Sequence, residues 1–349
     1  MTTLPPPVID RPRPQDDQAT RLRAMVESMG AGSRAETARP ASPTHAPARQ
    51  PGARAKVITI SSGKGGVGKT NLSVNLSIAM AGHGQRTTLL DADLSLANAD
   101  LLCGITPLKR LDRFVGIGEG HHPELQGRQG GIGELAIEAP GGFKLVPGAA
   151  GVSRMADLAP QEQAKLLAGI AVLERSADLL VIDTAAGLGR DVLSMIRIAD
   201  LSIVVATPEP TSIADAYALL KCAIVAAKER GAHHLRQCSP TGLNMAVVIN
   251  QAADKKEAKA VHARIAAVCQ KFLGYAPAML GWIAQDRHVG DAVRKRRPFM
   301  LEHPRSPASR CVESVATAAL ATLAPAGAAA QRKTEGLSDL LSRLVLRGR

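Results

Sequence analysis

The sequence predicts an α/β fold in which helices cover both faces of a doubly wound, mostly parallel sheet. Short, nearly continuous apolar segments alternate with helical stretches along the chain, a pattern typical of buried parallel strands joined by crossover helices. A glycine-rich turn joins the first of these segments to the first helix, which is where such folds bind phosphate groups. The 349 residues, 45% of them hydrophobic and 21% charged, are enough to bury a large core.

The domain with this fold is predicted to span residues 56–323. Its first strand is expected at 57–60 and leads through the glycine-rich turn to a helix that begins near Lys69. One face of that helix is apolar and consists of Leu72, Leu76, Ala79 and Met80. Further strands are expected at 87–90, 179–182, 203–206 and 246–249. Because parallel strands end at the same edge of a sheet, we expect the functional side chains to gather there.

Two short amphipathic helices are predicted outside this domain. Residues 1–55 are rich in Pro, Ala, Arg and Ser and are predicted to be mostly disordered, except for a helix at 16–30. A linker at 324–335 is followed by a helix at 336–349. The apolar face of that last helix consists of Leu337, Leu340, Leu341, Leu344 and Val345. Its apolar stripe and basic flank suit an anionic membrane surface, and docking on its own domain is the alternative.

Composition excludes several classes of protein. No stretch approaches the roughly 18 consecutive apolar residues of a membrane span, and the first residues do not have the pattern of a secretory signal. The five cysteines are far apart and form no CxxC pair, which argues against a disulfide framework or a four-cysteine zinc site. The chain has 43 Lys and Arg against 31 Asp and Glu, a net charge of +12. Such an excess suggests a nucleic acid, an anionic lipid or an acidic partner without choosing among them.

The glycine-rich turn fits the phosphate-binding pattern G-x-x-x-x-G-K-[ST]. Glycines allow the backbone to wrap closely around phosphates, and the backbone amides and the helix N-terminus attract the anion. Lys69 is expected to reach the β- and γ-phosphates, and the Thr70 hydroxyl to bind Mg²⁺. The residues of this loop are Gly63, Lys64, Gly65, Gly66, Val67, Gly68, Lys69 and Thr70.

Polar side chains follow three of the predicted strands. Asp91 and Asp93 follow the second strand, Asp183 the third and Asn250 the fifth. An acidic residue after a hydrophobic strand is the arrangement in which a carboxylate holds Mg²⁺ beside a phosphate-binding loop. The alternative for Asp91 and Asp93 is a helix cap or a turn.

The loop resembles that of the MinD/ParA family of deviant Walker A ATPases, because a second lysine, Lys64, stands early in GKGGVGKT. The resemblance covers the run Ile60–Asn75 and implies that ATP and Mg²⁺ are bound by a dimer. It implies that Lys64 reaches the phosphates bound by the partner subunit and is catalytic together with Lys69. It further implies a role for each of the strand-end residues. Asp91 would lie near Mg²⁺ with Thr70 and Asp183. Asp93 would position or deprotonate the attacking water, and Asn250 would contact the adenine.

Four segments resemble the flagellar branch of this family, known as FlhG, FleN or YlxH. They are DADLSLANADLLCG at 91–104, FKLVPG at 143–148, TPEPTSIADAYA at 207–218 and DQAxxLR at 17–23. The branch controls flagellar number and placement through ATP hydrolysis. The resemblance implies a switch between a cytoplasmic monomer and a dimer at the inner face of the cell membrane.

The same resemblance implies two partners. The first is the FlhF GTPase, which the segment at 17–23 would stimulate through Asp17, Gln18, Ala19, Leu22 and Arg23. The second is a flagellar transcription activator. For the 16–30 helix, the alternative is packing on its own domain.

The alternative function is that of a ParA-like DNA-segregation ATPase. Such an ATPase would explain the charge, and the basic run Arg294–Arg297 could contact DNA phosphates or could be a solvated helix end. It would not explain DQAxxLR or the terminal helix, so nucleic acid is not expected to be the main ligand. A nitrogenase-iron-protein-like reductase needs cysteines at positions where this chain has none. The extended N-terminal tail disfavours a septum-placement MinD.

Overall fold

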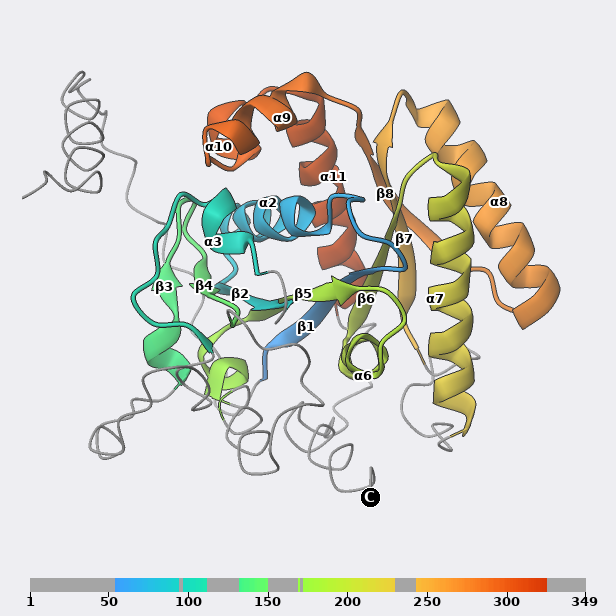
Figure 1. Cartoon of the computed structure of the whole chain (residues 1–349), viewed down its shortest axis with the longest axis horizontal. Helices are drawn as coiled ribbons and strands as arrows, with labels where there is room; N and C mark the ends of the chain where they lie inside the picture. The colour runs from blue at the N-terminus through green and yellow to red at the C-terminus, as the bar shows by residue number, and fades with distance from the viewer. Residues whose placement is uncertain are drawn as a thin grey trace, which may run out of the picture. The chain divides into compact units, whose positions relative to one another are not determined.

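One eight-stranded sheet forms the centre of the part of the chain that the computed structural model describes, which is residues 54–93, 97–111, 132–149, 169, 172–229 and 243–324. The strands lie in the order β3-β4-β2-β5-β1-β6-β7-β8 (Figure 1). All neighbouring strands are parallel except β3 and β4, which pair antiparallel. The predicted fold class is therefore confirmed.

Each of the five predicted strands lies within an observed strand. The strands are β1 (Lys56–Ser62), β2 (Thr87–Ala92), β3 (Ile137–Glu138), β4 (Lys144–Val146), β5 (Leu179–Ala186), β6 (Leu201–Ala206), β7 (Met245–Ala252) and β8 (Ala278–Ala284). The helices are α2 (Lys69–Gly82), α3 (Ala99–Leu102), α6 (Arg190–Ile198), α7 (Pro210–Glu229), α8 (Lys255–Leu273), α9 (Arg287–Arg294), α10 (Phe299–Glu302) and α11 (Pro307–Leu323), with a 3-10 turn η2 at Ile132–Leu135.

Helices cover both faces of the sheet, as predicted. On one face lie α2 and α11 with the short α3, α9 and α10, and on the other lie α6, α7 and α8 (Figure 1). The side chains of β6 show the consequence. Ile203 and Val205 enter the core beneath α2 and α11, while Val204 and Ala206 enter the core beneath α6, α7 and α8. Alternate residues are thus buried on opposite faces, which explains the nearly continuous apolar strands.

Helix α2 is buried nearly all round rather than on one face, so the prediction of a single apolar face was too narrow. It packs on the sheet and is also covered by α11, α10 and α3. Its buried polar side chains find partners. Asn75 accepts a hydrogen bond from the Met300 amide at 2.9 Å, and the Ser77 hydroxyl donates to the Ser73 carbonyl at 2.7 Å. These bonds allow polar residues to lie inside the core.

Helix α7 contains the one stretch in the described residues that is long and apolar enough to cross a membrane, Pro210–Ala227. In this structure it packs along β6 and α8, and Ala216, Leu219 and Leu220 are buried in the core beneath it. It is thus a part of the helical layer. Helix α11 ends at Leu323, where we predict the domain to end. The predicted tail, linker and terminal helix lie outside the described residues.

Candidate functional site

The phosphate-binding loop connects β1 to α2, as the sequence predicts. Gly66 and Gly68 have φ angles of 79° and 89°, in the left-handed region that favours glycine. Gly68 stands at the N-cap position of α2 and has no side chain to cap the helix. The first amides of α2 are therefore available to an anion.

Two distant segments hold the loop in place. The Asn250 side chain on β7 donates its amide to the Val67 carbonyl at 2.7 Å, and a Cβ atom on Gly68 would lie 2.4 Å from that amide nitrogen. A Cβ atom on Gly63 would lie 2.2 Å from the carbonyl oxygen of Asp215 on α7. Asn250 thus contacts the loop itself, and its contact with adenine stays a prediction.

The sheet register brings the predicted carboxylates together. Strands β2 and β5 extend beyond their predicted ends, so Asp91 and Asp183 lie within strands and not after them. The two residues are direct partners in the parallel pairing of β2 with β5, and Asp183 also pairs with Ile60 of β1. Burial raises the pKa of both carboxyls, and the charge of the nearby Asp93 adds to this rise, so the three acidic groups form one cluster beside the loop.

Asp183 has the environment of a metal ligand. Burial raises its pKa to about 6, opposed by the nearby Thr70 and Ser73 hydroxyls and by the charge of Lys69. The Ser73 hydroxyl donates to Oδ1 at 2.9 Å, whereas the buried Oδ2 has no hydrogen-bond partner among the described residues. A buried, unpaired carboxylate oxygen next to a threonine hydroxyl provides the oxygen ligands that Mg²⁺ prefers. The residues present therefore fit this ion.

Asp91 binds the backbone of its own segment. Its Oδ2 accepts hydrogen bonds from the amides of Asn98 at 3.0 Å and Ala99 at 3.1 Å, and its Oδ1 from the Asp93 amide at 3.2 Å. Burial, with the charge of Asp183 second, raises the pKa of Asp91 to about 8. In this structure Asp91 thus caps the start of α3. A helix cap is the alternative that the sequence analysis left open for this residue. The place of Asp91 near Mg²⁺ stays a prediction.

Lys64 does not contact the carboxylate cluster in any interaction that the structure shows. Its ammonium lies 2.6 Å from the Glu209 carboxylate and 3.0 Å from the Thr211 hydroxyl. Glu209 directly precedes α7, and Thr211 lies in its first turn. The lysine therefore contacts the TPEPT segment of its own chain.

Several residues that shape the site were missed in the sequence. Ser73 holds Asp183, and a Cβ atom on Gly148 would lie 2.8 Å from the Asp91 carbonyl oxygen and 2.7 Å from the Ala97 Cβ. In the sequence, the segments 143–148 and 207–218 indicate only a branch of the family. Nothing in their spacing indicates that they pack against Asp91 and the phosphate loop.

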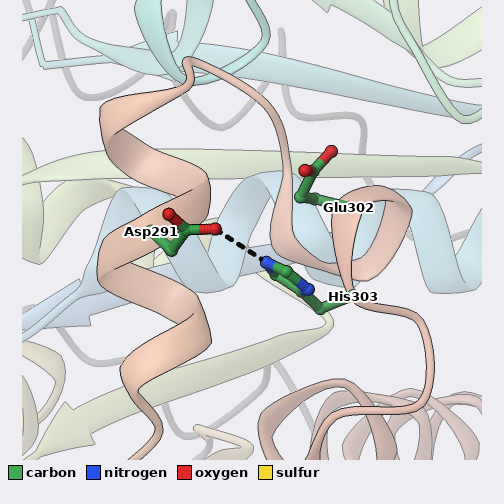
Figure 2. Close-up of side chains that lie close together, drawn as sticks. All are labelled: Asp291, Glu302 and His303. Carbon is green, nitrogen blue, oxygen red and sulfur yellow. Dashed lines mark hydrogen bonds and ion pairs between the residues drawn. The ribbon is translucent and has the colours of Figure 1, made fainter.

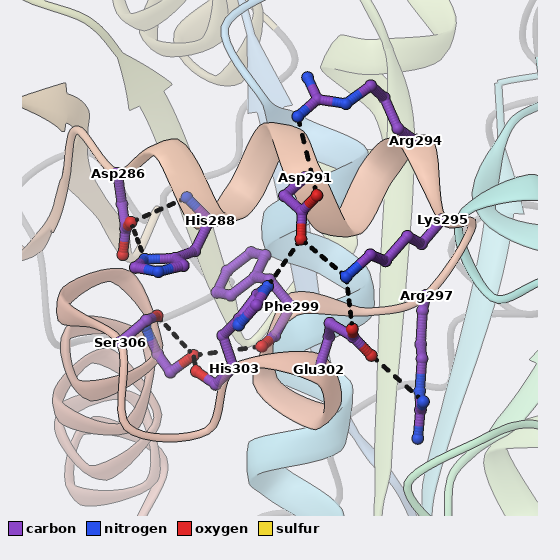
Figure 3. A network of polar contacts seen from close by, with 11 residues as sticks. Asp286, His288, Asp291, Arg294, Lys295, Arg297, Phe299, Glu302, His303 and Ser306 are labelled. Carbon is purple, nitrogen blue, oxygen red and sulfur yellow. Dashed lines mark hydrogen bonds and ion pairs between the residues drawn. The ribbon is translucent and has the colours of Figure 1, made fainter.

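A second polar cluster joins α9 and α10. Asp291, Glu302 and His303 carry oxygen and nitrogen atoms close enough to share a metal ion (Figure 2). The Lys295 ammonium, however, lies 3.0 Å from Asp291 and 2.9 Å from Glu302, and Arg297 lies 3.1 Å from Glu302 (Figure 3). Hydrogen bonds from Lys295 lower the pKa of both carboxyls. We interpret this cluster as an ion-pair network in which Lys295 and Arg297 supply the positive charge.

This network also bears on the basic run Arg294–Arg297. Lys295 and Arg297 are paired with acidic side chains, and Arg294 lies 3.7 Å from Asp291. Part of the run's charge is thus neutralised locally, which weakens the case for phosphate contacts with DNA.

Comparisons with known proteins agree with the geometry of the loop. A family profile described as the CobQ/CobB/MinD/ParA nucleotide binding domain matches residues 58–299. The antiactivator FleN of Pseudomonas aeruginosa is 39% identical over 261 residues, which are 75% of this chain and 85% of that protein. The chain belongs to the FlhG/FleN branch of the MinD/ParA family.

Other members of this family extend the comparison. The flagellum site-determining protein YlxH of Helicobacter pylori is 27% identical over 300 residues, 83% of this chain and 90% of that protein. The structure of the cell division ATPase MinD from Pyrococcus furiosus matches with a TM-score of 0.58 and 21% identity, covering 76% of this chain and 98% of that one. This likeness supports the fold.

The predicted partner and membrane contacts lie outside the described residues. The residues expected to bind FlhF are Asp17, Gln18, Ala19, Leu22 and Arg23. Those expected to bind the membrane are Leu337, Leu340, Leu341, Leu344 and Val345. Both sets stay predictions.

Proposed function

We propose that this chain is a deviant Walker A ATPase that controls the number and placement of flagella. In this proposal it binds ATP with Mg²⁺ and switches between a cytoplasmic monomer and a dimer at the inner face of the cell membrane. The observation that carries the ATPase assignment is the unpaired, buried Oδ2 of Asp183, beside Lys69 and Thr70 at the phosphate loop. The identity with FleN supports the flagellar role.

The residues of the site would share the work of phosphoryl transfer. The loop amides and the buried Lys69 hold the β- and γ-phosphates, and Asp93 orients the attacking water. Thr70 and Asp183 would hold Mg²⁺, with Asp91 beside them, and the ion would offset phosphate charge. Lys64 of each subunit would contact the phosphates bound by the other and stabilise the charge that develops there.

The proposed output is directed at flagellar assembly. FleN is named an antiactivator and YlxH a flagellum site-determining protein, which supports a flagellar transcription activator and an assembly factor as targets. The assembly factor would be the FlhF GTPase, stimulated by the segment at 17–23 through Gln18. The helix at 336–349 would bind anionic lipid, and dimerisation would double this weak contact.

The proposal is tested by two hydrolysis measurements on full-length protein. The wild type is expected to hydrolyse ATP in the presence of Mg²⁺, whereas Lys69→Ala should reduce hydrolysis at least a hundredfold because it removes a charge from the phosphates. In the second measurement, Gln18→Ala should abolish stimulation of FlhF GTPase activity and leave ATP binding intact. Undiminished hydrolysis by Lys69→Ala would overturn the site, and unaltered stimulation by Gln18→Ala would overturn the FlhF assignment.

A further inference from the structure

We propose that Ser73 is a positioning residue that orients the Asp183 carboxylate for Mg²⁺. In this proposal the Ser73 hydroxyl holds one carboxylate oxygen and thereby leaves the other oxygen to the ion. Ser73 itself contacts neither the ion nor the nucleotide. The inference rests on the proposed function, because it assumes that Asp183 holds Mg²⁺ beside a bound nucleotide.

Ser73 lies one turn into α2, at the point where this helix meets β5. It follows Lys69 by four residues and Thr70 by three, so all three side chains lie on the same side of the helix. The residue is fully buried, and its hydroxyl lies 2.9 Å from Asp183 Oδ1. The strand that carries Asp183 pairs with β1, which leads into the phosphate loop. Ser73 thus ties the helix after the loop to the strand beside the loop.

The Ser73 hydroxyl has one proton and two acceptors within reach. The Lys69 carbonyl oxygen lies 3.0 Å away and Asp183 Oδ1 lies 2.9 Å away. An ionised carboxylate is the stronger acceptor, so we expect the hydroxyl to donate to Asp183 whenever that group carries its charge. The Lys69 carbonyl does not depend on the hydroxyl, because an α-helix pairs each carbonyl with the amide four residues later.

The two oxygens of Asp183 have different surroundings. Oδ1 accepts the hydrogen bond from Ser73, whereas the buried Oδ2 has no hydrogen-bond partner among the described residues. A bond to Oδ1 restricts rotation of the carboxylate and so keeps Oδ2 in one place. The Thr70 hydroxyl does not replace Ser73 in this role, since it is proposed to bind the ion itself. Loss of an outer hydrogen bond of this kind typically lowers metal affinity or activity about 10- to 100-fold.

Ser77 offers a matched comparison on the same helix. It is also fully buried, and its hydroxyl donates to the Ser73 carbonyl at 2.7 Å. Within the described part of the chain the structure shows no bond from Ser77 to Asp183. Ser73→Ala and Ser77→Ala therefore each remove a buried hydroxyl that bonds to α2, but only Ser73→Ala removes a donor to the carboxylate.

The test measures how Mg²⁺ strengthens binding of a fluorescent ADP analogue to the full-length chain. The analogue is titrated in EDTA and at a series of Mg²⁺ concentrations. Ser73→Ala should raise the Mg²⁺ concentration needed for half of the effect about tenfold or more. Its affinity for the analogue in EDTA should equal that of the wild type, because the loop and Lys69 are intact. Saturating Mg²⁺ should restore the affinity of the variant.

Two further variants separate the hydroxyl from the volume of the side chain. Ser73→Cys fills the space of the serine with a much weaker donor, and it should show the same weakened response to Mg²⁺ as Ser73→Ala. Ser73→Thr keeps the hydroxyl and should respond like the wild type. Binding of the analogue in EDTA shows in each case that the site has folded.

The outcomes distinguish the inference from the proposed function. A wild-type response to Mg²⁺ in Ser73→Ala and Ser73→Cys would overturn the positioning role. An equal loss in Ser77→Ala would also overturn it, because the effect would then come from α2 and not from Asp183. A wild type that binds the analogue with no response to Mg²⁺, or does not bind it, would instead overturn the proposed ATPase site.

Discussion

At the scale of single residues, two acidic side chains share a buried place in the sheet. Asp91 and Asp183 are register partners on β2 and β5, and both are almost fully buried. Burial and mutual repulsion raise the pKa of Asp91 to about 8, against roughly 3.9 in an unfolded chain. Between these two pH values the folded protein keeps a proton that the unfolded chain has lost. Raising the pH through this window therefore favours unfolding.

We predict that Asp91→Asn removes this pH dependence from the nucleotide-free and metal-free protein. Asparagine is neutral at every pH, and its one carbonyl oxygen can still accept hydrogen bonds from the Asn98 and Ala99 amides, while its NH2 group replaces the oxygen that accepts from the Asp93 amide. The Tm of the variant should therefore rise relative to that of the wild type from pH 6 to pH 8.5, as the folded wild type loses the Asp91 proton. Thermal unfolding at several pH values checks this, and curves that run parallel would contradict the raised pKa.

A second residue-scale prediction concerns Gly148. In Gly148→Ala the new methyl group would overlap the Asp91 carbonyl and the Ala97 side chain, and such overpacking costs about 1–3 kcal/mol in the free energy of unfolding. Gly133→Ala is the matched control, since no atom of the described residues lies within 4 Å of its Cβ position and we expect a change below about 0.5 kcal/mol. Urea unfolding of both variants gives the comparison. Equal stability of Gly148→Ala and Gly133→Ala would show that Gly148 is not tightly packed against Asp91.

At this scale the sequence predicts which residues carry the chemistry of the site better than it predicts which residues they contact. The phosphate loop and Asp183 are found by local rules, because glycine, lysine and a strand-end carboxylate each have a direct physical role. The partner of Lys64 is not found, because Glu209 lies 145 residues away in the sequence. The capping of α3 by Asp91 depends on a turn whose path the sequence does not specify.

At the scale of elements, α2 is the helix on which much of the site depends. It begins at the phosphate loop, holds Asp183 through Ser73, and meets α10 through Asn75. The sequence indicates its start and one apolar face. It does not indicate that α11, α10 and α3 cover the rest, since such burial is set by long-range packing. The same reason explains why the two-residue β3 and the four-residue α10 were not predicted.

We predict that Asn75→Ala loosens the contact between α2 and α10. The substitution leaves the Met300 amide without its partner, which costs about 1–3 kcal/mol in the free energy of unfolding. Thr317→Ala on α11 is the control, because that exposed hydroxyl bonds only to its own helix in this structure. Hydrogen exchange of the Met300 amide should accelerate in Asn75→Ala and stay unchanged in Thr317→Ala. A protected amide in Asn75→Ala would contradict the prediction.

At the scale of the whole molecule, the described domain is proposed to work with segments at both ends of the chain. The sequence predicts five of the eight strands and the helices between them, and hence the architecture, because apolar strands separated by helices have few other solutions. It does not predict the order of the strands, which comes from the register of pairs far apart in the chain.

We predict that deletion of residues 336–349 abolishes ATP-dependent membrane binding. The deletion removes an apolar stripe with basic flanking residues, which is the expected lipid contact. Sedimentation with anionic vesicles should show pelleting of the wild type with ATP and no pelleting of the deletion variant, while ATP hydrolysis persists in solution. Equal pelleting of both proteins would place the lipid contact elsewhere.

The position of β1 in the sheet has a consequence for how the protein is made. This strand is synthesised before the others, yet its two neighbours, β5 and β6, begin at Leu179 and Leu201. At roughly 5–20 residues per second, several seconds pass before either neighbour leaves the ribosome. During that time a strongly apolar strand is without its pairing partners, and the loop that follows it lacks Asp183 and α7. ATP therefore finds no complete site on the nascent chain and assists folding only once the second half of the protein has been translated.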